Sequence, residues 1–135
     1  MKKVIIDAKE IAVGRLGSYA AKELLKGNSV VVINSEEAVI SGNKLDILYK
    51  IRVLRNKGGN SQNGPKFNKL PHRFVKRMIR GMLPWDRTKG QEAYKRLICH
   101  IGNGDLTAEE LKQVEKLDFK KPMKYVTIKE IVKLL

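Results

Sequence analysis

The fold is decided by residues 4–33, which read VIIDAKEIAVGRLGSYAAKELLKGNSVVVI. Val4-Ile5-Ile6 is a short β-branched run, as expected for a buried strand. Gly14 to Lys26 has apolar residues at four-residue spacing and is followed by a glycine, which predicts a helix. Ser29 to Ile33 is apolar on both faces, as in a sheet covered by helices on both sides. This order of strand, helix and strand predicts an α/β fold with parallel pairing.

Further elements follow downstream of this unit. They are a third strand at 38–40, helices at 43–57, 71–83 and 88–97, and a fourth strand at 98–101. The first of these helices has an expected apolar stripe of Ile47, Leu48, Ile51 and Leu54. Thr107 and Thr127 each precede a glutamate by three residues, which predicts two short C-terminal helices. At 135 residues we expect one domain, 1–135, with a basic segment at 44–96 and a helical tail at 103–135.

The net charge of +14 is concentrated in one segment of the chain. Lys44 to Arg96 contains 15 basic and 3 acidic residues, whereas the rest contains 13 basic and 11 acidic residues. Such a segment attracts a polyanion and repels itself when none is bound. A merely solvated basic surface is the alternative, but solubility does not require so one-sided a distribution. We therefore expect a polyanionic partner.

The helix predicted at 71–83 has two opposed faces. At about 100° per residue its cations fall within about 100° of arc, opposite the apolar residues. The cations are Arg73, Lys76, Arg77 and Arg80, and the apolar residues are Phe74, Val75, Met78, Ile79 and Met82. The preceding Gly- and Asn-rich loop, 58–69, lets backbone approach a folded surface and is expected to be mobile without RNA. Cations at this spacing suit successive phosphates, so we predict recognition of folded RNA by shape and backbone.

Membrane and DNA binding are weaker interpretations of the same charge. A basic amphipathic helix can lie on anionic lipid, but core packing requires an apolar face of this size. The longest apolar runs are too short to cross a bilayer, so no membrane partner is expected. A two-helix DNA-recognition unit and a zinc-ligand spacing are both missing. Aromatic residues make up only 6%, which argues against a platform for stacking single-stranded bases.

The signals for catalysis are poor. Gly102-Asn103-Gly104 lacks the third glycine of a dinucleotide fingerprint and predicts a turn. Gly14-Arg15-Leu16-Gly17 opens a helix where an anion can bind, although close helix packing is the simpler interpretation. His72 and His100 lack neighbours at metal or nucleophile spacing, and the single Cys99 predicts a buried hydrophobe. We expect no enzyme, cofactor, metal or small-molecule substrate; the alternative class is an RNA-modifying or nucleotide-binding enzyme.

Several motifs, in order along the chain, resemble one known family. Residues 71–84, PHRFVKRMIRGMLP, are similar to a signature of the universal large-subunit ribosomal protein thirteen family. The other matching motifs are Asp7-Ala8 with 14–18, residues 39–44, and Lys89-Gly90 with Ala93 and Leu97. The resemblance spans roughly residues 4–102, and the short loop after Lys57 is similar to the archaeal branch. Trp85-Asp86 departs from the family pattern, which has basic or small polar residues there.

The resemblance implies both a fold and a function. The fold is a three-layer α/β/α arrangement with a four-stranded parallel sheet, ordered 3-2-1-4, plus extra C-terminal helices. The function is that of a non-catalytic constituent of the cytoplasmic large ribosomal subunit, which binds large-subunit rRNA, supports assembly and contacts neighbouring large-subunit proteins. The tail helices are candidates for packing on such a neighbour. The predicted RNA-binding residues are Arg15, Lys50, Arg52, Arg55, Lys57, Lys66, Lys69, Arg73, Lys76, Arg77, Arg80, Gly81, Pro84, Arg87 and Lys89.

Overall fold

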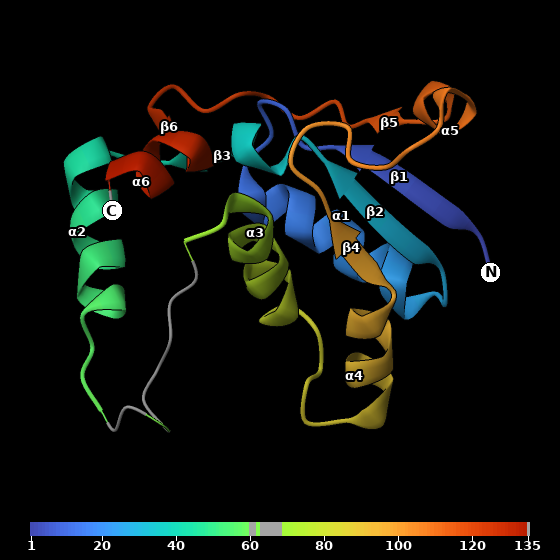
Figure 1. The fold of residues 1–135 in the computed structure, drawn as a ribbon, viewed down its shortest axis with the longest axis horizontal. Coiled ribbons are helices and arrows are strands. Elements are labelled where there is room, and N and C mark those ends of the chain that lie inside the picture. The colour runs from blue at the N-terminus through green and yellow to red at the C-terminus, as the bar shows by residue number, and fades with distance from the viewer. Residues whose placement is uncertain (60–61, 63–68, 135) are drawn as a thin grey trace.

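The computed structural model, which describes residues 1–59, 62 and 69–134, contains a four-stranded, all-parallel sheet with the order β4-β2-β1-β5, seen on the right-hand side of Figure 1. The strands are β1 (Lys3–Asp7), β2 (Ser29–Ile33), β4 (Leu97–Cys99) and β5 (Glu115–Lys116). The helices are α1 (Val13–Leu25), α2 (Lys44–Arg55), α3 (Pro71–Arg80), α4 (Thr88–Lys95), α5 (Ala108–Lys112) and α6 (Ile128–Leu134). Each predicted helix is present, with ends that differ by a few residues.

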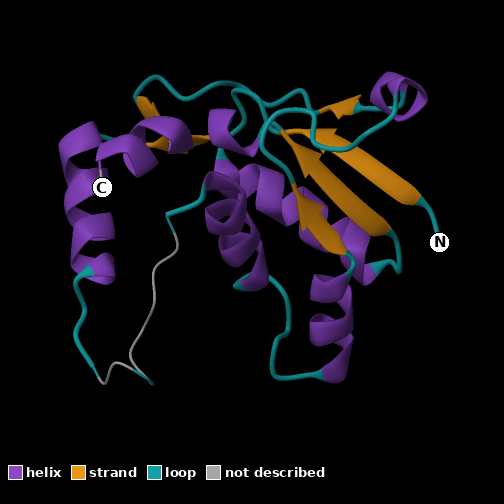
Figure 2. Ribbon diagram, viewed as in Figure 1, coloured by secondary structure: helices purple, strands orange, loops and turns teal. Residues whose placement is uncertain are grey.

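Alternate residues of β1 and β2 face two hydrophobic clusters. Val4 and Ile6 belong to the larger cluster, which also contains buried side chains of α1, α3, α4 and α6. Ile5 and Val31 belong to the smaller cluster on the opposite face, where Leu111 of α5 packs. The sheet is therefore covered by helices on both faces (Figure 2), which confirms the predicted three-layer α/β/α fold.

Numbered along the chain, the strands of this sheet are ordered 3-2-1-4 as predicted, but two of the four were assigned wrongly. The strand predicted as the fourth along the chain is β4. It is in fact the third strand of this sheet along the chain, and it lies beside β2 with Ile98 opposite Val31. The fourth strand of this sheet along the chain is β5, which pairs with β1 and was not predicted. The predicted third strand at 38–40 is β3 (Val39–Ser41), which pairs antiparallel with β6 (Tyr125–Thr127) in a separate sheet.

The short connection after β2 explains why β3 cannot take the predicted place. Between β2 and β3 the chain forms only the 3-10 turn η1 (Ser35–Glu37) and its flanking residues. A parallel pair requires a crossover of roughly a dozen residues or more. The chain instead crosses through α2, α3 and α4 before it returns beside β2 as β4.

The interpretation of Gly14 to Gly17 as a packing motif is correct for one of the two glycines. A Cβ on Gly17 would lie 2.6 Å from Met82 Sδ, so Gly17 allows the close approach of α1 to the end of α3. A Cβ on Gly14 would meet nothing within 4 Å. Leu16 and Leu24, the apolar positions of the predicted helix, are fully buried.

The structure corrects two expectations, one about the apolar stripe of α2 and one about the secondary structure of the tail. Leu54, expected in the apolar stripe of α2, is 48% exposed, although Leu48 and Ile51 are buried. Leu54 lies in the last turn of α2, beyond Ile51, which is the last buried residue of this helix. The tail is not only helical, since it also supplies β5 and β6. Of its two helices, α6 packs on this chain with Ile128 and Ile131 fully buried, whereas α5 has no residue that is fully buried.

Candidate nucleic-acid interface

The orientation of α3 is fixed by its apolar face. Phe74, Val75 and Ile79 are buried in the main core, and Pro71 occupies the first turn, where its missing N–H costs no hydrogen bond. The opposite face must therefore point away from the core. The predicted separation of apolar and cationic faces is confirmed for these positions, while Met78 is 37% exposed at the boundary.

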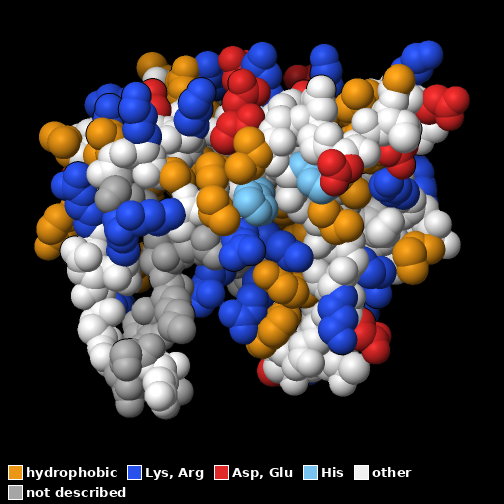
Figure 3. Space-filling model, in the orientation of Figure 1, with side chains coloured by type: hydrophobic (Ala, Val, Ile, Leu, Met, Phe, Trp, Pro, Cys, Tyr) orange, Lys and Arg blue, Asp and Glu red, His pale blue; other side chains and the backbone are white. Residues whose placement is uncertain are grey.

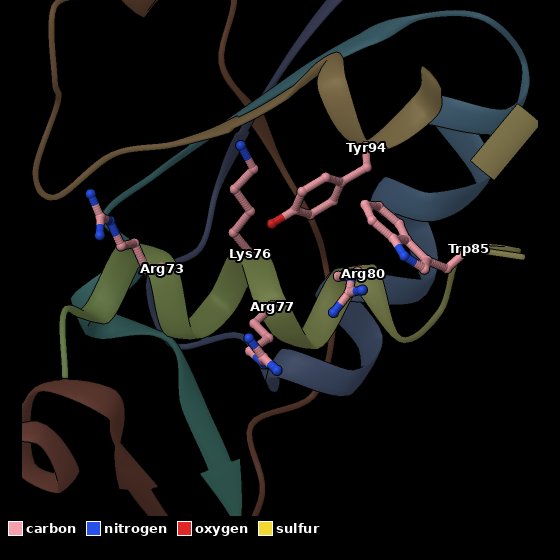
Figure 4. Close-up of a pocket in the computed structure, with 6 residues that line it drawn as sticks. All are labelled: Arg73, Lys76, Arg77, Arg80, Trp85 and Tyr94. Atoms are coloured by element: carbon pink, nitrogen blue, oxygen red, sulfur yellow. The ribbon is translucent and has the colours of Figure 1, made fainter. Parts of the chain in front are cut away.

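The cations of this face line a hollow of about 390 Å³ together with two aromatic residues from the following segment (Figure 4). We call this the α3 hollow; its residues are Arg73, Lys76, Arg77, Arg80, Trp85 and Tyr94. Figure 4 shows Arg80 beside Trp85, Lys76 reaching toward Tyr94, and Arg73 and Arg77 extending away from the aromatic rings. The structure thus brings together the four cations that the helical periodicity had grouped.

Aromatic rings orient two of the cations without neutralising them. Arg80 Cζ lies 4.1 Å from the centroid of the Trp85 ring, and Lys76 Nζ lies 4.8 Å from that of Tyr94. The two rings contact edge to face, with centroids 5.2 Å apart and planes at 89°. Cation–π contacts of this kind are worth about 0.5–1 kcal/mol at exposed sites. They hold each cation in place while its full positive charge still faces solvent.

Ion pairs do not neutralise this surface in the described part of the chain. The pairs found there are Lys3–Glu110, Lys26–Glu23 and Lys121–Glu10, and none includes a cation of the α3 hollow. His72 at the start of α3 has a pKa below its usual value, because burial, then Arg73 and His100, disfavour its charged form. A space-filling view shows the Lys and Arg side chains gathered below the histidines (Figure 3). The site attracts anions and offers them unpaired donors.

Several other predicted residues lie on α2 and just before α3. Lys50 of α2 and Lys57, just beyond the end of α2, line a separate hollow with exposed Tyr49 and do not line the α3 hollow. Arg52 donates from Nη2 to the Leu134 carbonyl at 3.1 Å, so it also holds α6 against α2. Arg55 is half-buried, with an interaction of its own, and Lys69 is exposed. Lys66 and most of the loop at 58–69 lie outside the described residues, so their predictions stay untested.

The remaining predicted residues lie around the turn after α3, with one exception. Gly81 is the C-cap of α3, and exposed Arg87 and Lys89 stand at the start of α4. The Pro84 backbone packs closely against α4, because a Cβ on Gly90 would lie 2.0 Å from the Pro84 carbonyl oxygen. Arg15 is the exception: it lies on α1 with its Cζ 5.8 Å from the Phe119 ring, and it does not line the α3 hollow.

Sequence reasoning missed the aromatic members of the α3 hollow. Trp85 was noted only as a departure from the family pattern, yet its ring supports Arg80. A tryptophan directly after the proline that follows a basic helix was an available signal. Tyr94 gave no comparable signal, because only the tertiary fold brings this residue of α4 near Lys76 of α3.

The sites considered for other chemistry have structural explanations. Burial raises the pKa of the Cys99 thiol to about 12, so the predicted buried cysteine is confirmed and stays protonated. The glycines of the predicted turn, Gly102 and Gly104, have φ of 63° and 58°. Among residues 1–59, 62 and 69–134, groups of three or more potential metal ligands are not found. The described helices also include none with the length and apolarity needed to span a membrane.

Comparison with known proteins gives a consistent match over most of the chain. The family model described as "Ribosomal protein L13" matches residues 1–105. A protein of Archaeoglobus fulgidus named "Large ribosomal subunit protein uL13" is 38% identical, covering 97% of this chain and 86% of its own length. The protein of the same name from Methanocaldococcus jannaschii is also 38% identical, with coverages of 97% and 96%. That of Methanosarcina barkeri is 41% identical, with coverages of 84% and 78%.

Proposed function

The chain belongs to the ribosomal protein L13 family, archaeal type, and from this premise we propose that it binds large-subunit rRNA through the α3 hollow and thereby supports subunit assembly. Proteins of this family are structural and not enzymes, and this chain is a constituent of the large subunit of cytoplasmic ribosomes. This removes the alternative of an RNA-modifying or nucleotide-binding enzyme. Neighbouring large-subunit proteins are proposed as further partners.

The observation that carries the proposal is the group of unneutralised cations on one rigid helix face. Arg73, Lys76, Arg77 and Arg80 lie close enough to repel one another, and the described carboxylates pair with none of them. A phosphate backbone relieves this repulsion and accepts the hydrogen bonds that the guanidinium groups offer. RNA binding therefore turns an unfavourable cluster into a favourable one.

The aromatic residues add a means of recognising more than charge. Trp85 is 37% exposed and its ring is held by Arg80 on one side and Tyr94 at its edge. Such a ring is positioned to contact a base or ribose that leaves a helical stack. Phosphate contacts from Arg73 and Arg77 would then fix the RNA strand beside it.

We propose that the interface extends from the α3 hollow along both flanking segments, within a single domain that includes the tail. Its proposed RNA-binding residues outside the hollow are Lys50, Arg52, Arg55, Lys57, Lys66, Lys69, Gly81, Pro84, Arg87 and Lys89, and we propose Arg15 on α1 as an RNA-binding residue at a separate surface. If about 10 phosphates are contacted, the log–log dependence of affinity on salt should have a slope of roughly −7 to −9.

The test is a triple charge reversal, Arg73→Glu with Arg77→Glu and Arg80→Glu. A matched control reverses three exposed lysines away from the hollow, Lys112, Lys116 and Lys129. We expect the hollow variant to be excluded from large subunits in sucrose gradients while the control is incorporated. We also expect its salt slope on rRNA to be smaller in magnitude by about 2–3. Both should keep the wild-type circular dichroism spectrum; equal incorporation of the two variants would refute the proposal.

A further inference from the structure

A second group of cations lies in the segment between β5 and β6. Residues 120–125 read KKPMKY and contain three lysines without an acidic residue. Lys120, Lys121 and Lys124 are all exposed. Outside 44–96 the chain has 13 basic and 11 acidic residues, so its net charge there is small and does not reveal this group. Many of those acidic residues lie elsewhere in the fold.

The helix α1 adds cations to the same surface. Arg15 lines one hollow with Lys120 and Lys121, and a second, adjoining hollow with Lys22 and Phe119. Arg15 and Lys22 are seven residues apart on α1 and therefore lie on one helix face. We call the surface formed by Arg15, Lys22, Lys120, Lys121 and Lys124 the strap surface.

This surface repeats the chemistry of the α3 hollow. Arg15 Cζ lies 5.8 Å from the Phe119 ring, and Lys121 Nζ lies 4.3 Å from the Tyr125 ring. Carboxylates also lie near this surface: Glu10 pairs with Lys121 at 3.6 Å and its side chain is 62% exposed, and Glu115 accepts a hydrogen bond from Tyr19, which lines the second hollow. An ion pair this exposed is worth little and leaves the net charge of the surface positive.

The segment between β5 and β6, here called the strap, is anchored at both ends, which restricts the positions that its lysines can take. On one side β5 pairs with β1, and the Tyr19 hydroxyl donates to Glu115 at 2.7 Å. On the other side β6 pairs with β3, and the Gly42 N–H donates to the Lys124 carbonyl at 2.9 Å. Anchored cations lose less conformational entropy on binding a phosphate than cations on a free tail.

The strap and the α3 hollow lie on different sides of the molecule. Figure 1 shows the segment between β5 and β6 along one edge, across the fold from the region where α3 faces α4. The hollows of the strap surface share none of their lining residues with the α3 hollow. A single short stretch of RNA that fills the α3 hollow therefore leaves the strap surface uncovered.

We propose that the strap surface is a second RNA-binding site, so that one protein molecule joins two RNA segments. The proposal rests on the proposed function, because it assigns the same polyanion to a second place. RNA is favoured over an acidic protein because cations paired with aromatic rings recur on both surfaces, and because rRNA is the abundant polyanion of the subunit. Joining two segments is also what support of assembly requires in physical terms.

The test counts duplexes bound per protein molecule, with a short RNA duplex of about one helical turn as probe and native mass spectrometry as readout. Wild-type protein should bind two duplexes. The strap variant, with Lys120, Lys121 and Lys124 each changed to Glu, should bind one, as should the α3 hollow variant. Combining both sets should leave none bound. The matched control with Lys112, Lys116 and Lys129 changed to Glu should still bind two.

The possible outcomes separate this inference from the proposed function. If wild type binds one duplex, and only the α3 hollow variant loses it, the second site is refuted while the first stands. The same conclusion follows if the strap variant still binds two duplexes, as expected if the surface serves an acidic protein. If wild type binds none, both proposals fail. Circular dichroism of each variant shows that a lost duplex does not reflect a lost fold.

Discussion

The sheet region and the α3 hollow are built from side chains that are stabilised in opposite ways. In β1 and β2 the apolar residues are almost completely buried, with Ile6, Val30 and Val32 at 0% exposure. In the α3 hollow, cations lie near one another and two rest on aromatic rings. Burial of apolar area stabilises the first region without any partner. The second region reaches its lowest free energy only when an anion is bound.

This difference separates the residues that determine the fold from those that we propose to bind RNA. α3 belongs to both groups, since Val75 and Ile79 are fully buried while Arg73 and Arg77 are exposed. α2 leans toward the binding side, because Tyr49 is 71% exposed and Leu54 is 48% exposed. Substitutions in the two regions should therefore affect different measurements.

We expect the largest effect from a comparison of the same substitution at a buried position and at an exposed position. Leu24→Ala removes a fully buried side chain of α1 and should lower the free energy of unfolding by about 2–5 kcal/mol. Leu54→Ala on α2 should change it by about 0.5 kcal/mol or less, because that side chain is already 48% exposed. Urea denaturation followed by circular dichroism measures both. Equal losses would mean that α2 is as much a part of the core as α1.

The next prediction concerns alanine substitutions at two glycines, which test how tightly the turn after α3 is packed. Gly90→Ala places a Cβ 2.0 Å from the Pro84 carbonyl oxygen, so the turn or α4 must move, at a cost of about 1–3 kcal/mol. The same shift displaces Trp85, and RNA affinity should fall together with stability. Gly14→Ala is the control: a Cβ there meets nothing, and a gain of about 0.5 kcal/mol is expected. A neutral Gly90→Ala would contradict this packing.

The fold was predictable from sequence wherever local pattern and burial agree. The β-branched runs of β1 and β2, the four-residue spacing of α1 and the capping residues gave the α/β class and the helices. β5 was missed because Glu115–Lys116 is a two-residue strand of charged side chains with no β pattern. The assignment of β3 failed because a three-residue strand does not indicate its pairing partner. That partner, β6, lies more than eighty residues away in sequence.

The candidate site was predictable to the extent that one helix carries it. Helical periodicity is enough to place Arg73, Lys76, Arg77 and Arg80 on one face. Their contacts with Trp85 and Tyr94 depend on how the chain turns after α3, which charge and periodicity do not indicate. The cations of the tail were missed for a related reason, since only the tertiary fold brings Lys120 next to Arg15.

A third prediction tests the anchor that joins the sheet region to the strap. Hydrogen bonding to Glu115, followed by burial, raises the pKa of the Tyr19 hydroxyl from 10.0 to about 12. The folded protein thus holds this proton more tightly than the unfolded chain does. The resulting stabilisation, about 1 kcal/mol for a partly exposed bond to a carboxylate, is complete below pH 10 and is lost as pH rises toward 12.

Tyr19→Phe should therefore be less stable than wild type at pH 8, and the difference should vanish by about pH 12. Chemical denaturation at several pH values measures it, and Tyr49→Phe, at an exposed position on α2, is the control that should show no such trend. A difference that does not depend on pH would show that Tyr19 acts through packing and not through its proton.

The smallest expected effect lies at Asn43, where the separate β3–β6 sheet leads into α2. Its side-chain oxygen accepts a hydrogen bond from the Leu45 N–H at 3.4 Å, which is long for such a bond. Asn43→Ala should therefore cost about 0.5 kcal/mol, at the low end for loss of an N-cap. Hydrogen exchange should show faster opening in the first turn of α2 and no change in β1 or β2, because the hydrogen bonds of those strands are made with each other and with β4 and β5. If protection also fell in β1, the division between the two regions would be wrong, and α2 would have to be counted as part of the cooperative core.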